Sequence, residues 1–141
     1  MTRTRTIPFL AATVLAAIVA GAAAAATGPS HASLVIRHQT RGCHSWAVNG
    51  GAFAPAQSIA LKTGTTITIT NNDVMPHLLV QTSGPKVALT RPAMNHMSAI
   101  TRVSFPHKGV YVFMTKAGED YMAGVKTVGE DNVLRLKVTV A

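Results

Sequence analysis

The chain has 141 residues, with 13 Lys and Arg against 5 Asp and Glu and a formal net charge of +8. This length favours a single domain. The basic residues are scattered and only 5% of the residues are aromatic, so the composition argues against a nucleic-acid-binding protein. A basic surface of this kind suits an acidic protein partner or an anionic membrane surface.

The first 26 residues have the pattern of a secretory signal peptide. Arg3 and Arg5 precede an Ala-rich apolar run that ends in Ala24-Ala25-Ala26. The small residues predict cleavage after Ala26, whereas a retained membrane anchor is the alternative because the run is nearly long enough to span a bilayer. We expect an exported protein, in the periplasm, at the cell surface or outside the cell, with the signal at 1–26 and the folded domain at 34–141.

Strand patterns dominate the rest of the chain. Alternation and turn residues predict strands near 34–37, 58–61, 66–70, 78–81, 99–105, 110–114 and 133–140. Between 110 and 114 we expect Met114 to lie in the core, on the face of Val110 and Val112. Thr90 to Met97 is the one segment with a helix pattern, which Pro92 limits. The sequence therefore predicts an all-β sandwich or barrel of about six to eight short strands.

Two places in the sequence suggest metal ligands. Pro76 precedes His77 at the entrance to a predicted strand, where the backbone on both sides holds the imidazole. Cys43 is the only cysteine, next to His44. A lone thiol in an exported protein oxidises or pairs between chains unless it is buried or bound to a metal. A structural His77 and a buried apolar Cys43 remain the alternatives.

The order of the motifs resembles that of the cupredoxins, the small Greek-key copper proteins. The segments that carry the resemblance are Gly50-Gly51-Ala52-Phe53-Ala54-Pro55, the run from Gly64 to Asn71, His77, and the run from Phe105 to Phe113. It extends from Phe53 to Val140. The resemblance implies a Greek-key β-sandwich or barrel at 34–141, with His77 in the place of the family's first histidine ligand.

The chain departs from the cupredoxin pattern where the family has its remaining ligands. Thr115 stands where the family places its cysteine, and Gly118-Glu119 stands about where Gly-His often occurs. An ordinary blue-copper site, which needs a thiolate and a second histidine, is therefore not expected in this loop. Met122 is in the approximate place of the axial methionine.

The remaining soft donors suggest a rearranged site. The segment Ala93-Met94-Asn95-His96-Met97 adds two thioethers and an imidazole, although an ordinary loop is the alternative for it. Sulfur combined with imidazole favours copper, Cu(I) in particular, over hard cations. We expect the metal ligands to be His77 first, then Cys43 or His44, with Met122 or Met97 as the thioether.

The function predicted is copper binding by an exported cupredoxin-like protein. The ion would be Cu(I) or Cu(II). The protein would bind and transfer copper or exchange one electron, with an acidic redox or copper-transfer protein as the partner. The alternative is a metal-free scaffold that binds a protein or a surface. An enzyme is not expected, because the chain has no nucleophile elbow, no phosphate-binding loop and no regular zinc-ligand spacing.

Overall fold

The structure is a computed structural model, and it describes residues 29–39, 44–117 and 133–141. The expected signal segment at 1–26 lies outside the described residues, as do two of the predicted ligands, Cys43 and Met122. No helix capable of spanning a membrane occurs in the described part of the chain.

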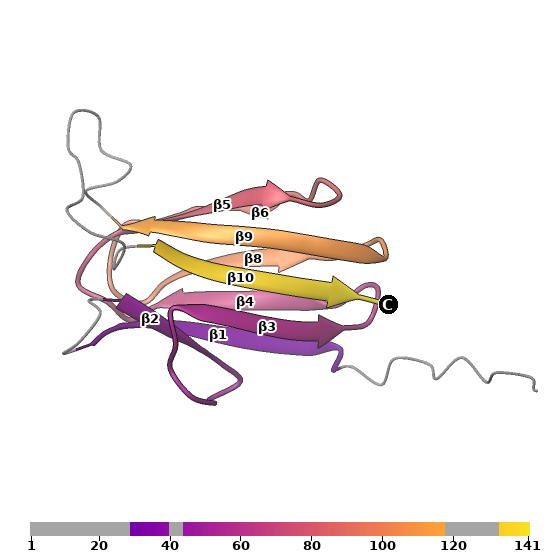
Figure 1. Cartoon of the computed structure of the whole chain (residues 1–141). Coiled ribbons are helices and arrows are strands. Elements are labelled where there is room, and N and C mark those ends of the chain that lie inside the picture. Colours follow the sequence, from indigo (N-terminus) through magenta and orange to yellow (C-terminus); the bar gives the residue numbers. More distant parts are fainter. Residues whose placement is uncertain (1–28, 40–43, 118–132) are drawn as a thin grey trace, which may run out of the picture.

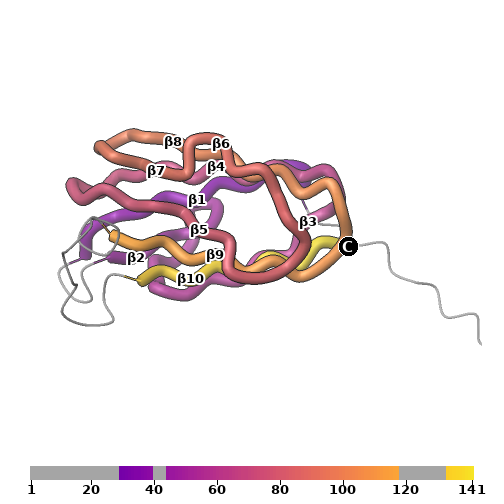
Figure 2. Tube along the Cα trace, turned by 90° about the horizontal axis from the view of Figure 1, so that it is seen from above, coloured from indigo at the N-terminus to yellow at the C-terminus, as the bar shows by residue number. Residues whose placement is uncertain are grey.

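The described residues form two five-stranded sheets that pack face to face as a sandwich (Figures 1 and 2). One sheet contains, in spatial order, β2 (His44–Val48), β1 (His31–His38), β4 (Thr66–Asn71), β8 (Ala99–Ser104) and β6 (Leu89–Thr90). The other contains β3 (Ala56–Leu61), β10 (Val133–Val140), β9 (Gly109–Ala117), β5 (His77–Ser83) and β7 (Ala93–Met94). β1 pairs with β4, and β10 with β3, in parallel, so both sheets are mixed. The predicted all-β sandwich is confirmed.

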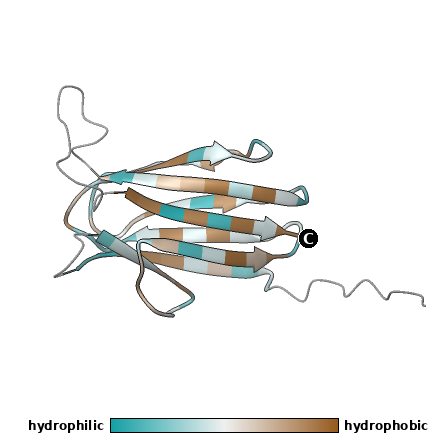
Figure 3. Ribbon diagram, in the orientation of Figure 1, coloured by the Kyte–Doolittle hydropathy of each residue, from teal (hydrophilic) through white to brown (hydrophobic). Residues whose placement is uncertain are grey.

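Alternating side chains from both sheets fill the core between them. Ile67 and Ile69 of β4 are buried on one face, as their spacing predicts, and so are Leu134 and Leu136 of β10. Figure 3 shows the same alternation of apolar and polar residues along the strands. In an antiparallel or mixed sheet with one solvated face, this period of two fixes which side chains enter the core.

Two local predictions are wrong. Met114 is only half-buried and Val110 is 46% exposed, whereas Tyr111 and Phe113 of the same strand are fully buried. The large aromatic rings therefore occupy the core in place of Met114. The segment 90–97 is not helical, because Arg91 has a φ of 56° and the chain on either side of Pro92 forms β6 and β7.

One end of the sandwich collects residues from both sheets. Because β1 runs parallel to β4 and antiparallel to β2, His38 at the end of β1 lies near the end of β4 and the start of β2. In the other sheet, His77 at the start of β5 pairs with Ala117 at the end of β9. This end is on the left in Figure 1.

Candidate metal centre

Buried Asn71 fixes the loop between β4 and β5. Its side-chain Oδ1 accepts a hydrogen bond from the backbone N–H of Asp73 at 2.9 Å, and its Nδ2 donates to the carbonyl of Met75 at 2.9 Å. The Asp73 carboxylate in turn accepts from the backbone N–H of Met75 at 3.1 Å. Short polar side chains that bind the backbone two residues on stabilise this kind of turn. The loop therefore holds the Asp73 side chain in a fixed direction.

Asn71 also joins this loop to the segment that follows β7. Its Nδ2 donates to the carbonyls of Met94 at 3.1 Å and His96 at 3.4 Å, and its own carbonyl accepts from the backbone N–H of Ser98 at 2.6 Å. A single buried amide thus ties two loops together at the end of the sandwich.

Three histidines and one carboxylate meet at this end, and we call them the end cluster: His38, His44, Asp73 and His77. The Asp73 carboxylate is fully buried, and its Oδ2 lies 2.5 Å from His44 Nδ1 and 3.4 Å from His77 Nε2. The rings of His44 and His77 contact each other edge to face, with centroids 4.9 Å apart.

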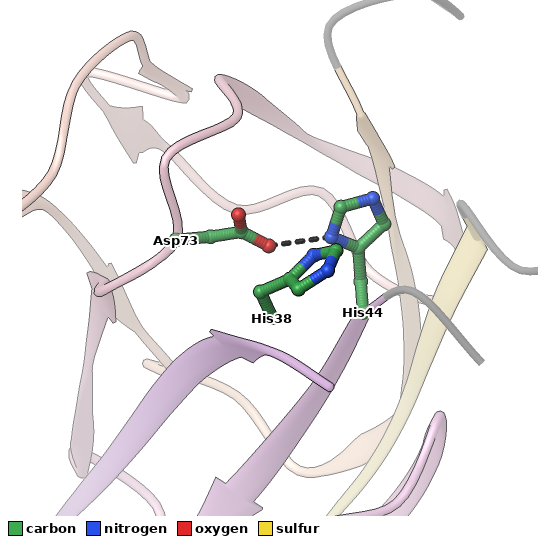
Figure 4. Close-up of side chains that lie close together, drawn as sticks. All are labelled: His38, His44 and Asp73. Carbon is green, nitrogen blue, oxygen red and sulfur yellow. Dashed lines mark hydrogen bonds and ion pairs between the residues drawn. The ribbon is translucent and has the colours of Figure 1, made fainter. Parts of the chain in front are cut away.

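His38 lies on the exposed side of the end cluster. Figure 4 shows its ring beside the hydrogen-bonded pair of His44 and Asp73. One potential ligand atom from each of these three residues lies within 4.8 Å of the others. Because His44 and Asp73 are buried while His38 is exposed, the cluster reaches from the interior to the surface.

The hydrogen bonds define the protonation states in the cluster. A carboxylate can only accept, so His44 donates to Asp73 through Nδ1–H. Burial alone would raise the pKa of Asp73, but hydrogen bonds from Met75 and His44, together with the charge of His44, outweigh it and lower that pKa. Burial also lowers the pKa of His77, and the nearby His44 lowers it further. The cluster therefore favours an ionised carboxylate beside a neutral His77 imidazole.

Thr115 lies beside His77, in the place where the cupredoxin pattern has its cysteine. The Thr115 Oγ1 is 3.5 Å from His77 Nδ1, and both side chains are fully buried. The position is thus spatially adjacent to the predicted first ligand, but it supplies a hydroxyl instead of a thiolate. A hydroxyl is not the soft ligand that a blue-copper centre needs.

The structure brings together two of the five ligands predicted from the sequence. His77 and His44 are both buried in the end cluster, whereas Cys43 and Met122 lie outside the described residues. The Met97 side chain is 53% exposed, and its backbone carbonyl accepts a hydrogen bond from His96 Nδ1 at 2.8 Å. The ligand role of each residue stays a prediction.

Met94 lies beside His77 in the structure, although the two residues are far apart in the sequence. Its Cα is the register partner of His77 in the antiparallel pair of β5 and β7, and its side chain is fully buried. Side chains of directly opposite residues in an antiparallel pair lie on the same face of the sheet. The Met94 thioether and the His77 imidazole therefore enter the sandwich side by side.

Sequence reasoning missed Asp73 and His38 as members of the cluster. Asp73 belongs to an Asn-Asn-Asp run that is typical of turns, and His38 lies at an exposed strand end. The one local signal was the Asp73-x-x-x-His77 spacing, with the chain's first carboxylate just ahead of the predicted ligand. The contact with His44 depends on how two distant strands pack, which no local pattern gives.

The structure is similar to solved structures of copper proteins at low sequence identity. No protein-family model and no curated protein sequence matches the chain. Amicyanin from Paracoccus versutus is 16% identical, over 77% of this chain and 81% of that chain, with a TM-score of 0.42. A purple cupredoxin from Nitrosopumilus maritimus is 19% identical, over 77% and 98%, with a TM-score of 0.43.

A multicopper oxidase from Campylobacter jejuni, described as a metallo-oxidase, is 15% identical over 79% of this chain and 25% of that chain, with a TM-score of 0.48. The described residues form a two-sheet all-β sandwich, the architecture that the motif order predicted. At identities of 15 to 19% and TM-scores below 0.5, these likenesses carry no family, ligand, partner or residue role to this chain.

Proposed function

We propose that this is an exported copper-binding protein that holds its ion at the end cluster, for copper binding and transfer or for one-electron exchange. The observation that carries the proposal is the fully buried Asp73 carboxylate, which contacts the buried imidazoles of His44 and His77. His38, His44 and Asp73 each place one potential ligand atom within 4.8 Å of the others, and His77 contacts both Asp73 and His44. These donors would take the place of the thiolate loop of an ordinary blue-copper site.

The electrostatics of the cluster suit a cation. A carboxylate without exposure to water is costly to keep ionised unless hydrogen bonds or an opposite charge compensate for it. The lowered pKa values of Asp73 and His77 keep the first ionised and the second neutral near pH 7. Metal ions bind these deprotonated forms, so no proton has to be removed from either group before an ion enters.

The donors among the described residues favour Cu(II). Imidazole and carboxylate are borderline and hard ligands, and among the divalent ions the general affinity order places copper first. The buried thioether of Met94 beside His77 offers a soft ligand that would also hold Cu(I). Bound copper would supply a centre that gains and loses one electron, and the protein supplies the ligands and their orientation.

The charge of the described surface suits an acidic partner. His38 is exposed, so an ion or a partner can approach the cluster from solvent on that side. Among the described residues Asp73 is the only acidic one and it is buried, whereas the described lysines and arginines are mostly exposed. An acidic redox or copper-transfer protein would be attracted to this surface, with an association that weakens in salt.

Copper titration of the full chain and its variants tests the proposal. We expect one copper ion per chain and at least a tenfold loss of affinity, about 1.4 kcal/mol, in His44→Ala and in His77→Ala. His31→Ala is the matched control, because His31 begins β1 while His38 ends it, at the opposite end of the sandwich. A silent titration with both Cu(I) and Cu(II), or an unchanged affinity in both cluster variants, rejects the proposal.

A metal-free scaffold that binds a protein or a surface is the second candidate. One observation favours it: both ring nitrogens of His77 have protein partners, with Asp73 Oδ2 at 3.4 Å from Nε2 and Thr115 Oγ1 at 3.5 Å from Nδ1. The ring is therefore satisfied without an ion. Metal analysis of the protein purified from its own host separates the two candidates, since only the first predicts stoichiometric copper.

A further inference from the structure

A second polar site lies on the outer side of the sandwich, and none of its lining residues belongs to the end cluster. A cavity of about 520 Å³ opens there between the end of β6, the loop after β7 and the outer face of β8. We call it the arginine pocket. The residues that matter for its chemistry are Thr90, Arg91, His96, Ser98, Ile100 and Arg102.

The strand register brings the polar groups of the arginine pocket to one face. Thr90 of β6 is the register partner of Arg102 in β8, and both side chains are exposed. Ile100 precedes Arg102 by two residues on the same strand, so its side chain lies on the same outer face. The guanidinium group of Arg102 and the hydroxyl of Thr90 therefore lie on the same face as the apolar side chain of Ile100.

Backbone strain is concentrated at the arginine pocket. Three non-glycine residues in the described part of the chain have positive φ, and two of them, Arg91 at 56° and Ser98 at 66°, line this pocket. The left-handed region costs an ordinary residue about 1–2 kcal/mol. Strained residues of this kind cluster at binding and catalytic sites.

Among the described residues, none places a negative charge at the arginine pocket. Neither Arg91 nor Arg102 forms an ion pair with a described residue, and the one described acidic side chain, Asp73, is buried against histidines. His96 donates its Nδ1–H to the carbonyl of Met97, and its ring lines the same cavity. Within the described part of the chain, Arg91 and Arg102 therefore form a positively charged site beside hydroxyl and imidazole groups.

From this geometry we propose that the arginine pocket binds a small oxyanion, a carboxylate or phosphate compound with a short apolar part. The planar guanidinium group presents paired N–H donors that match the oxygens of a carboxylate or phosphate. The hydroxyls of Thr90 and Ser98 add neutral donors, and Ile100 offers apolar contact. The volume is in the range of pockets for small molecules, about 300–1,000 Å³.

Anion titration followed by NMR tests this inference on the full chain without added copper. The probes are inorganic phosphate and succinate, each against sodium chloride at the same ionic strength. We expect saturable shifts of the backbone amides of residues 90–102 with at least one oxyanion and none with chloride. A response to phosphate alone or succinate alone supports the inference and identifies the anionic group that the pocket prefers.

Charge-matched variants distinguish the pocket from the overall basic charge. Arg102→Gln and Arg91→Gln are each expected to weaken oxyanion binding at least tenfold, whereas Arg135→Gln, on the exposed side of β10, changes it less than twofold. All three remove one positive charge, and a urea midpoint confirms that each variant is folded. An equal loss in all three variants, or no saturable shift with either oxyanion, overturns the inference.

Discussion

Asp73 Oδ2 accepts a hydrogen bond from His44 Nδ1 at 2.5 Å, although the two residues are 29 positions apart in the chain. The carboxylate belongs to the loop after β4, and the imidazole is the first residue of β2, so the bond crosses from one edge of a sheet toward its centre. Both groups are buried. A buried ionised acceptor of this kind fixes which nitrogen of the ring carries the proton.

Replacing Asp73 by Asn should weaken both copper binding and the fold. Asn has nearly the same shape but no charge, so the buried imidazoles of His44 and His77 lose their anionic partner. We expect copper affinity to fall at least tenfold, about 1.4 kcal/mol. The free energy of unfolding of the metal-free protein should fall by about 1–3 kcal/mol, measured by urea denaturation.

Asn72→Ala is the matched control for Asp73→Asn, because Asn72 is the exposed neighbour in the same loop. It should leave both quantities within experimental error. Wild-type copper affinity in Asp73→Asn would show that the carboxylate takes no part in holding the ion.

Introducing a cysteine at Thr115 should convert the centre toward a thiolate site. The Thr115 Oγ1 is already 3.5 Å from His77 Nδ1, and a cysteine would place its sulfur near the same position. A copper-bound thiolate gives an intense visible absorption that imidazole and carboxylate ligands do not give. We therefore expect Cu(II)-loaded Thr115→Cys, made together with Cys43→Ser to remove the native thiol, to absorb strongly in the visible.

Thr101→Cys in the same Cys43→Ser background is the control, because Thr101 is also a buried threonine but its hydroxyl donates to the carbonyl of Thr90. It should show no such band. Copper bound to Thr115→Cys without the band, or the same band in both variants, would contradict the placement of Thr115 beside the ion.

Much of the fold was predictable because its signals are local. The alternation of Ile67 with Ile69 and of Leu134 with Leu136 correctly identified strands and inward faces. The Met114 prediction failed because both faces of that strand are apolar, and period two cannot tell which one enters the core. In this strand the face with Tyr111 and Phe113 enters the core, because the aromatic side chains bury more apolar area.

The candidate site was predictable only in part. The motif order and the position after Pro76 predicted His77 as a metal ligand. His44 was predicted because it is adjacent to Cys43. The partnership of each with Asp73 depends on the packing of β2 against the β4–β5 loop, a non-local relationship. In a run such as Asn-Asn-Asp, the same residue types are typical of a turn and can also bind a metal. The sequence alone therefore does not show which role Asp73 has.

Acid should destabilise the metal-free protein in two steps. The pKa of His77 is below the ordinary 6.5 in the folded state, so the unfolded chain takes up a proton first as the pH falls below about 6.5. Its contribution to stability is therefore lost from that pH downward, until the pH reaches the folded pKa. The pKa of Asp73 is below 3.8 in the folded state, so its contribution is present above 3.8 and lost as the pH falls through the folded pKa.

Urea midpoints measured from pH 8 to pH 3 in the presence of a chelator check this prediction. His77→Gln should have a smaller decrease between pH 6.5 and pH 5 than the wild type, since glutamine does not titrate and the exposed histidines are common to both. Identical pH profiles for the two proteins would show that burial of His77 does not bias its protonation.

Among the described glycines, Gly84 should tolerate a side chain least, for a reason independent of the metal centre. Its φ is 98°, and a Cβ added there would lie 2.4 Å from the carbonyl oxygen of Val110 and 2.9 Å from the Cα of Tyr111. Gly64, with a φ of 84° and nothing within 4 Å of an added Cβ, is the matched control. In both alanine variants the left-handed backbone should lower the free energy of unfolding by about 1–2 kcal/mol.

Gly84→Ala should cost a further 1–3 kcal/mol or so, because backbone of β9 has to move to relieve the overpacking. Urea denaturation of both variants measures the difference, and equal losses would place the backbone of β9 farther from Gly84 than the structure does. Gly84 follows β5 at the end opposite to His77, so copper affinity should be unchanged in the folded variant. A parallel loss of copper affinity would mean instead that strain at one end of the sandwich reaches the end cluster through β5 and β9.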